Sequence, residues 1–254
     1  MVSESVKRIK INQNTEANCY IKYALPMLPV PRNIRICFSK TGSLQYISHL
    51  DLQRLFARAL IRAGLPLWYT QGFNPHPKMV FALPLPVGVQ SVCEFLDVKF
   101  DRDMSCPDAQ ALLDEELTDE MRILDVYEPT TKFSDIAYAK YEIRLSTVGA
   151  DVALAEKAER FFTTSPILMT KRTKSGEKSL DITALISAFS AKFDENTREI
   201  HIETTLSAGS ESLNPELLIA ALRKYEILPP ASLLEETYSI LRKQVLCADG
   251  SVFR

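Results

Sequence analysis

The chain has 254 residues, 46% of them hydrophobic and 24% charged, and its formal net charge is −2. This composition is typical of a folded protein with one large domain or two of ordinary size. The small net charge argues against a generic nucleic-acid binder, and no run of 18 apolar residues predicts a membrane span. The polar first residues do not resemble a secretory signal.

The first region of the chain predicts a strand followed by a helix. Residues 1–33 lack periodicity and end in a Pro-rich stretch, so we interpret them as a tail or linker. Polar and apolar residues alternate over Ile34–Phe38, as in a half-buried strand. Ser48 is expected to cap a helix that carries Asp51 at its third position and ends at Gly64.

The rest of the chain gives a repeated pattern of strands and helices. In the first half we expect extended segments at Leu67–Thr70, Met79–Leu83 and Val92–Phe100. An acidic helix at Pro107–Leu117 and a closing strand at Met121–Tyr127 follow them. In the second half we expect strands at Tyr141–Leu145, Glu199–Leu206 and Tyr238–Leu246, and helices at Asp151–Phe162 and Pro215–Tyr225. The segments Ile167–Thr170 and Ser179–Ile182 are expected to flank a basic turn and form a hairpin. The sequence therefore predicts an α+β fold of two tandem ferredoxin-like (βαββαβ) units, at 34–130 and 137–254.

Charge is unevenly distributed between neighbouring segments. Residues 34–100 contain seven Lys and Arg against three Asp and Glu, whereas residues 101–135 contain three against eleven. This asymmetry predicts one basic and one acidic face. A solvated acidic helix beside an ordinary domain explains it equally well.

Three arginines are spaced to share one face of the first helix. Arg54, Arg58 and Arg62 stand at i, i+4 and i+8, and their planar guanidinium groups suit phosphates or a partner's carboxylates. Alternatively they form a solvated face that pairs with acidic neighbours such as Glu94 or Asp97.

The turn-rich segment from Gly72 to Lys78 predicts a rigid loop, because two prolines flank His76. Phe73 could stack on a base, Asn74 could read a base edge and Lys78 could neutralise a phosphate. His76 could transfer protons near neutral pH. The alternative is a turn whose Phe73 packs into the core.

His49 and Asp51 lie in the first turn of the arginine helix, where a neutral His49 could act as a base. His49 could instead fasten the helix to a neighbouring strand, or it could meet His76 at one end of the sheet. A basic hairpin tip could contact phosphate or only add solubility; it carries Lys171, Arg172, Lys174 and Lys178. The loop at Gly209, before the helix at Pro215, could receive an anion.

The five cysteines form no Cys-x-x-Cys pair, and there are only three histidines. We therefore expect no disulfide framework, no metal site and no cofactor, and a reducing, cytoplasmic location.

Several ordered motifs together resemble one known family. Tyr46–Asp51, the arginine helix up to Pro66, Thr70–Lys78 and Leu83–Gly88 are similar to the radical-SAM-linked family, a domain of unknown function found beside or fused to radical SAM proteins with a cobalamin-binding-like region. The similarity is strongest over Ile34–Glu128 and weaker but collinear in the second half. The chain lacks the Cys-x3-Cys-x2-Cys triad of a radical SAM enzyme, so the resemblance implies a protein that associates with such an enzyme.

These features favour a non-catalytic partner of a radical SAM protein that binds structured RNA, tRNA or rRNA, for modification or processing. One alternative is a metal-independent RNA-processing or RNA-modifying enzyme that uses His49, His76 and Asp51. A further alternative is a purely structural adaptor for the radical SAM partner.

Overall fold

The structure is a computed structural model that describes residues 27–164, 166–173, 176–228 and 236–254. The elements of the first half are β1 (Met27–Lys40), α2 (His49–Arg62), β2 (Met79–Phe81), β3 (Val89–Arg102), α3 (Cys106–Asp114) and β4 (Ile123–Tyr127). The elements of the second half are β5 (Ile136–Ser146), α4 (Val152–Thr164), β6 (Leu168–Thr173), β7 (Gly176–Asp181), β8 (Ile186–Asp194), β9 (Glu199–Ser207), α5 (Glu216–Lys224) and β10 (Thr237–Cys247). Short 3-10 helices lie at Gly42–Tyr46, Phe133–Asp135 and Thr183–Leu185.

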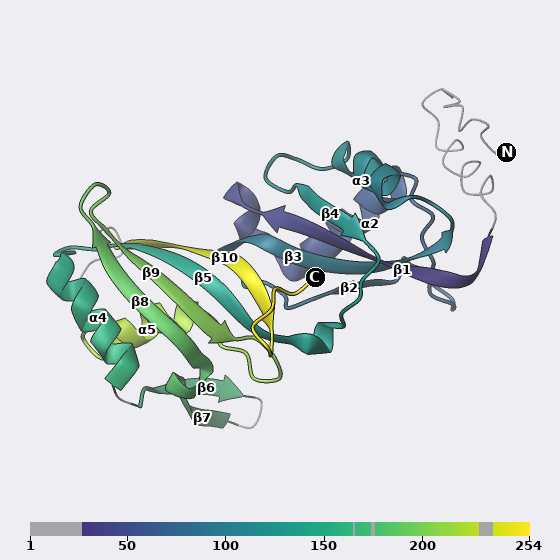
Figure 1. Ribbon diagram of the computed structural model, residues 1–254. Coiled ribbons are helices and arrows are strands. Elements are labelled where there is room, and N and C mark those ends of the chain that lie inside the picture. The colour runs from purple at the N-terminus through teal and green to yellow at the C-terminus, as the bar shows by residue number, and fades with distance from the viewer. Residues whose placement is uncertain (1–26, 165, 174–175, 229–235) are drawn as a thin grey trace.

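One continuous sheet runs through both halves of the molecule, in the order β4-β1-β3-β10-β5-β9-β8, with β2 added to β3 (Figure 1). All its pairs are antiparallel except β3 with β10. Within each half the first and third main strands lie in the centre, as β1 and β3 do in β4-β1-β3-β2 and as β5 and β9 do in β10-β5-β9-β8. This is the split βαβ arrangement of the ferredoxin-like fold, and the predicted α+β class is confirmed. Because the halves share one sheet, their division into two separate units stays a prediction.

The second half differs from the prediction at one strand. The expected segments at 167–170 and 179–182 form a separate hairpin, β6-β7, and the strand beside β9 is instead β8. Sequence reasoning missed β8 although Phe189, Ala191 and Phe193 alternate with Ser190 and Lys192. This alternation covers only five residues, and Ala191 is the one residue of the strand that is buried.

The first strand begins earlier than expected, at Met27, so residues 27–33 are not part of a tail. Pro29 and Pro31 fit within β1 because β4 pairs only with Arg35–Phe38, which leaves the beginning of β1 at an edge. Residues 1–26 of the predicted tail lie outside the described residues.

Helix α2 forms as the sequence predicts. The Ser48 hydroxyl accepts a hydrogen bond from the Asp51 amide at 3.1 Å, which satisfies one of the free N–H groups at the helix start. Its apolar face is buried and includes Phe56, whose ring lies 4.6 Å from that of Phe38 on β1. The helix ends at Arg62, and Gly64, just past the C-cap residue Ala63, has a φ of 67° that favours a glycine.

Strand β3 contributes to two hydrophobic cores. Its later residues, such as Leu96 and Phe100, pack with α2 and α3. Its earlier residues, such as Val89 and Phe95, belong to the core of the second half. None of the helices in the described ranges is long and apolar enough to cross a membrane.

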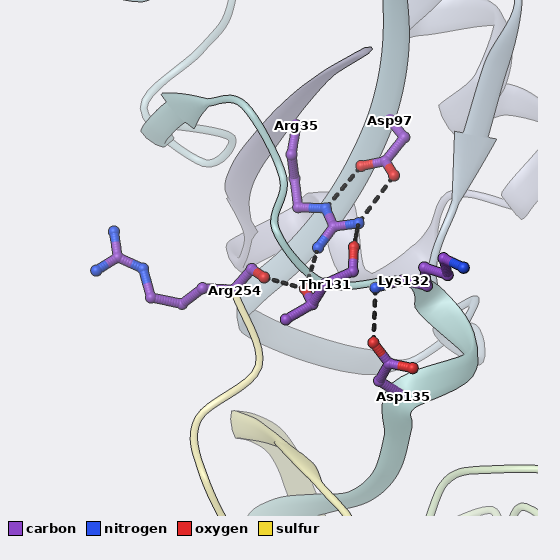
Figure 2. Close-up of polar contacts among 6 residues, drawn as sticks. All are labelled: Arg35, Asp97, Thr131, Lys132, Asp135 and Arg254. Atoms are coloured by element: carbon purple, nitrogen blue, oxygen red, sulfur yellow. Dashed lines mark hydrogen bonds and ion pairs between the residues drawn. The ribbon is translucent and has the colours of Figure 1, made fainter.

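A buried arginine ties the connection between the halves to the sheet (Figure 2). Arg35 on β1 donates to both carboxylate oxygens of Asp97 on β3, at 2.7 and 2.9 Å. Its other donors reach the hydroxyl and the carbonyl oxygen of Thr131, at 2.8 and 3.1 Å. The guanidinium carbon lies 4.6 Å from the ring centroid of Phe133 and 4.7 Å from that of Phe253. We call these five residues the Arg35 cluster.

Replacing Arg35 should strongly destabilise the fold. We expect Arg35→Ala to lower the free energy of unfolding by about 3–5 kcal/mol, because it leaves the Asp97 carboxylate without its cation and removes the guanidinium group that lies between two rings. Arg35→Lys should be intermediate, since an ammonium cannot form the same planar fork. Urea unfolding followed by circular dichroism measures both.

The matched control is Arg254→Ala, which breaks an exposed pair with Asp125 and should change the free energy of unfolding by less than about 1 kcal/mol. Equal stability of the Arg35→Ala and Arg254→Ala variants would contradict the role given to the Arg35 cluster.

Candidate functional site

The Gly72–Lys78 loop projects from the first half and is held at its base. Thr70 donates its amide to the His76 carbonyl at 2.9 Å, and the Lys78 amide donates to the Trp68 carbonyl at 3.1 Å. The His76 amide donates to the Thr70 hydroxyl at 3.2 Å, and the His76 ring nitrogen Nδ1 lies 3.1 Å from both that hydroxyl and the Asn74 carbonyl. The base of the loop is therefore braced by hydrogen bonds, while residues 71–76 are exposed.

An aromatic and basic surface surrounds this loop. The Phe73 side chain is fully exposed and packs into no core, which overturns the alternative that it fills one. Trp68 is half-buried, and the ammonium groups of Lys78 and Lys99 lie 5.6 and 5.8 Å from its ring centroid. We call Trp68, Phe73, Asn74, Lys78 and Lys99 the loop surface.

The arginines of α2 are less available than their spacing suggests. Arg54 pairs with Asp51 at 3.2 Å and Arg62 pairs with Glu116 at 2.7 Å, both as partly exposed ion pairs. Arg58 is exposed and has no ion pair with any residue in the described ranges. Two of the three helix arginines are therefore paired with carboxylates, as in the alternative given above. Their partners are not Glu94 and Asp97, because these two carboxylates face buried arginines instead.

The candidate acid–base residues do not converge. His49 packs edge-on against Phe81, with ring centroids 5.4 Å apart, and accepts a hydrogen bond from the Gln53 amide at 3.0 Å. His76 is bound to Thr70 before the start of β2, whereas Phe81 ends that strand, and the five residue steps from His76 to Phe81 can span roughly 16 Å. The Ser48 hydroxyl and Arg54 lower the pKa of Asp51, so this carboxylate is held as the partner of a helix cap. The three groups thus lack the shared geometry that acid–base catalysis needs.

The basic hairpin is present as β6-β7. Lys171 pairs with Lys178 and Arg172 with Glu177 along the backbone, whereas Lys174 lies outside the described residues. Within the described ranges, no group of three or more His, Cys, Asp or Glu side chains could hold a metal ion.

Sequence reasoning missed a cleft between the two halves. It has a volume of about 410 Å³, and its walls come from the segment after β2, from β5, β6 and β7, from the start of α5 and from β10. The lining residues are Leu83, Pro84, Pro86, Tyr141, Met169, Thr170, Leu180, Ser212, Leu213, Asn214, Pro215, Leu217 and Arg242. One of the motifs that carry the family resemblance, Leu83–Gly88, lines this cleft through Leu83, Pro84 and Pro86.

Buried charges lie beside the cleft. Arg242 on β10 and Glu94 on β3 form an ion pair at 3.3 Å, with side chains only 1% and 4% exposed. Arg242 also donates to the Leu83 carbonyl at 2.9 Å, and Leu83 has an unusual positive φ of 41°. Lys40, also buried, interacts with the same Glu94, and burial lowers the pKa of its ammonium group. The signal in the sequence was Glu94 and Arg242 within strand-like runs, where buried charges are rare.

Comparisons with known proteins come from family models, curated proteins and solved structures. A family model described as "Uncharacterized protein conserved in bacteria (DUF2344)" matches residues 33–215. The resemblance to a family of unknown function is thus confirmed, while its link to radical SAM proteins stays a prediction. Curated proteins give no significant match.

Three solved structures illustrate the structural similarity. A crystal structure of a Cbf5-Nop10-Gar1 complex is 10% identical with a TM-score of 0.44; the match covers 88% of this chain but only 56% of that one. An encapsulated DyP-type peroxidase from Mycobacterium smegmatis is 10% identical with a TM-score of 0.20, and the match covers 84% and 93% of the two chains. DyPB from Rhodococcus jostii is 11% identical with a TM-score of 0.19 and coverage of 85% and 94%. With TM-scores this low, none of the three supports a shared function.

The buried pair beside the cleft makes a stability prediction. Glu94→Met should lower the free energy of unfolding by about 3–5 kcal/mol, because it leaves Arg242 and Lys40 buried without a carboxylate. Arg242→Met should destabilise less, since Lys40 remains near Glu94. The double variant Glu94→Met/Arg242→Met should recover part of the loss in urea unfolding. Strictly additive effects would show that the two residues do not interact.

Proposed function

This chain belongs to the family of uncharacterized proteins conserved in bacteria (DUF2344), and we propose that it is a non-catalytic RNA-binding partner of a radical SAM enzyme. The observation that carries the RNA-binding part is the loop surface, where a fully exposed Phe73 lies on the same loop as Lys78, whose ammonium group flanks the Trp68 ring together with that of Lys99. Unpaired bases stack on exposed aromatic rings, and neighbouring lysines neutralise the phosphates.

The loop is also built to present these groups with little ordering cost. Its base is braced by the bonds between Thr70 and His76 and between Lys78 and Trp68. A preorganised surface loses less conformational entropy on binding than a flexible one. Stacking tolerates any base, so this surface supports affinity for single-stranded or looped RNA more than sequence specificity. Arg58, which has no ion pair in the described part of the chain, adds one further cation on α2.

The proposed association with a radical SAM enzyme rests on the resemblance of the sequence motifs to the radical-SAM-linked family and on two apolar side chains that these motifs expose. The Gly88 amide donates to the carbonyl of Gln45, the residue before Tyr46, at 2.9 Å, which ties the signature segment at 83–88 to the start of the one at 46–51. Beside this bond, Tyr46 and Val87 are 68% and 52% exposed. We propose that these two exposed side chains, which we call the docking patch, form part of the surface that the radical SAM partner contacts.

The catalytic alternative has less support, because His49 and His76 have separate partners and, within the described part of the chain, no hydrogen bond links either of them to Asp51. A chain that presents RNA leaves the chemistry to its partner.

We predict that the loop surface dominates RNA binding. Phe73→Ala should weaken binding of a small structured RNA by about tenfold, because one stacked base contributes roughly 1–3 kcal/mol. Lys78→Glu should also weaken binding and should lower the slope of log affinity against log salt by about 1. Fluorescence anisotropy at several salt concentrations measures both.

The matched control is Arg160→Glu, the same change of charge at an exposed position of α4. Wild-type affinity in both loop variants, or no RNA retained at low salt, would overturn the proposal. Cleavage of the RNA in EDTA that is lost in His49→Ala or His76→Ala would instead establish the catalytic alternative.

The docking patch gives a separate prediction. We expect a tagged chain to co-purify with a radical SAM protein, and Val87→Glu to abolish that association because it places a charge within an apolar contact. The same variant should retain its affinity for RNA. Association unchanged by Val87→Glu would show that the partner binds elsewhere, and the absence of any radical SAM protein would remove this part of the proposal.

A further inference from the structure

The cleft between the halves has the size of a small-molecule site. Its volume of about 410 Å³ falls within the range of ligand pockets, roughly 300–1,000 Å³. Most of its wall is apolar and is built by leucine, proline and methionine side chains. The polar groups are few and come from Tyr141, Thr170, Ser212, Asn214 and Arg242.

The lining of the cleft carries positive charge and no negative charge. Arg242 is its only charged residue, and no Asp or Glu belongs to the described lining. Tyr141, Thr170 and Ser212 add hydroxyl groups that can donate hydrogen bonds, and Asn214 adds an amide. A ligand in the cleft would therefore meet a cation and several donors but no carboxylate.

Arg242 is incompletely satisfied by the protein. Its side chain is 99% buried, and its Nε has no hydrogen-bond partner in the described part of the chain. Glu94 is its only carboxylate, and Glu94 also interacts with the buried ammonium group of Lys40. Two buried cations thus share one carboxylate, and such an excess of positive charge favours an additional anion.

The start of α5 adds positive electrostatic potential to the cleft but no free hydrogen-bond donors. The Glu216 and Leu217 amides are already bonded to Asn214, at 3.1 and 3.0 Å. The helix macrodipole still places partial positive charge at the residues that line the cleft. Recognition of the anion would therefore fall to Arg242 and the hydroxyl groups.

We propose that this cleft binds a small organic anion, with one phosphate or carboxylate group directed to Arg242 and an apolar body against Leu83, Met169 and Leu180. Phosphate and carboxylate groups each offer two oxygens that can accept a pair of parallel hydrogen bonds from a planar guanidinium. This site is distinct from the loop surface and does not depend on RNA binding.

The test is a titration of the full chain, labelled with ¹⁵N, with hexyl phosphate, hexanoate and neutral hexanol. At least one anion should shift the amide signals of Asn214 and Leu217 saturably, whereas hexanol at the same concentration should bind at least tenfold more weakly. Equal binding of hexanol would show that the cleft is only apolar. No saturable shift with either anion would also overturn the proposal.

Two variants locate the site. Ser212→Asp places a negative charge in the cleft at an exposed position and should weaken anion binding by about tenfold. Ser210→Asp makes the same change on the same loop but outside the lining, and should alter affinity less than twofold. Equal affinities in the two variants would contradict the assigned site.

The variant Glu94→Met/Arg242→Met, if it folds, should lose anion binding, while Ser212→Asp keeps the test decisive if it does not. Adding the RNA that binds the loop surface should leave the anion bound. Displacement of the anion by RNA would show that the cleft belongs to the RNA site and would overturn a separate small-molecule site.

Discussion

The buried guanidinium of Arg35 is the interaction on which the arrangement of the two halves depends. A buried guanidinium is tolerated only where its donors are satisfied and its charge is paired. Asp97 supplies the charge, and Thr131 in the connection between the halves accepts the remaining hydrogen bonds. Phe133 and Phe253 lie against the cation, so the connection and the end of the chain both return to this point. The sheet can therefore continue from one half into the other.

The second constraint is that two strands share one edge of β3. β10 pairs with its residues 89–91 in parallel, and β2 pairs with its residues 96–98 in an antiparallel ladder. Between them the segment after β2 turns away at Leu83, whose backbone is held in the left-handed region while its carbonyl accepts from Arg242. The segment that turns away between these two pairings forms one wall of the cleft. Strain and buried charge thus occur together where the halves meet, as is common at functional sites.

The signature segment has several separate tasks in this structure. The apolar face of α2 and the Ser48 cap build the first core, which is a structural role. The Gly72–Lys78 loop presents an aromatic and basic surface, and the segment at 83–88 lines the cleft and exposes Val87. These surfaces face different partners in our proposals, namely RNA, an organic anion and a protein.

The sequence alone determined the α+β class, the bounds of α2 with its Ser48 cap and the rigid loop, because these follow from local periodicity, capping and proline content. It failed at β8, where the alternation of Phe189, Ala191 and Phe193 covers only five residues, and at the start of β1, where prolines suggested a tail. Only the tertiary structure decided that Arg62 is paired with Glu116 and that His49 and His76 stay apart. It also decided that Glu94 and Arg242 meet beside a cleft. These outcomes depend on contacts between residues distant in the chain, which no local pattern encodes.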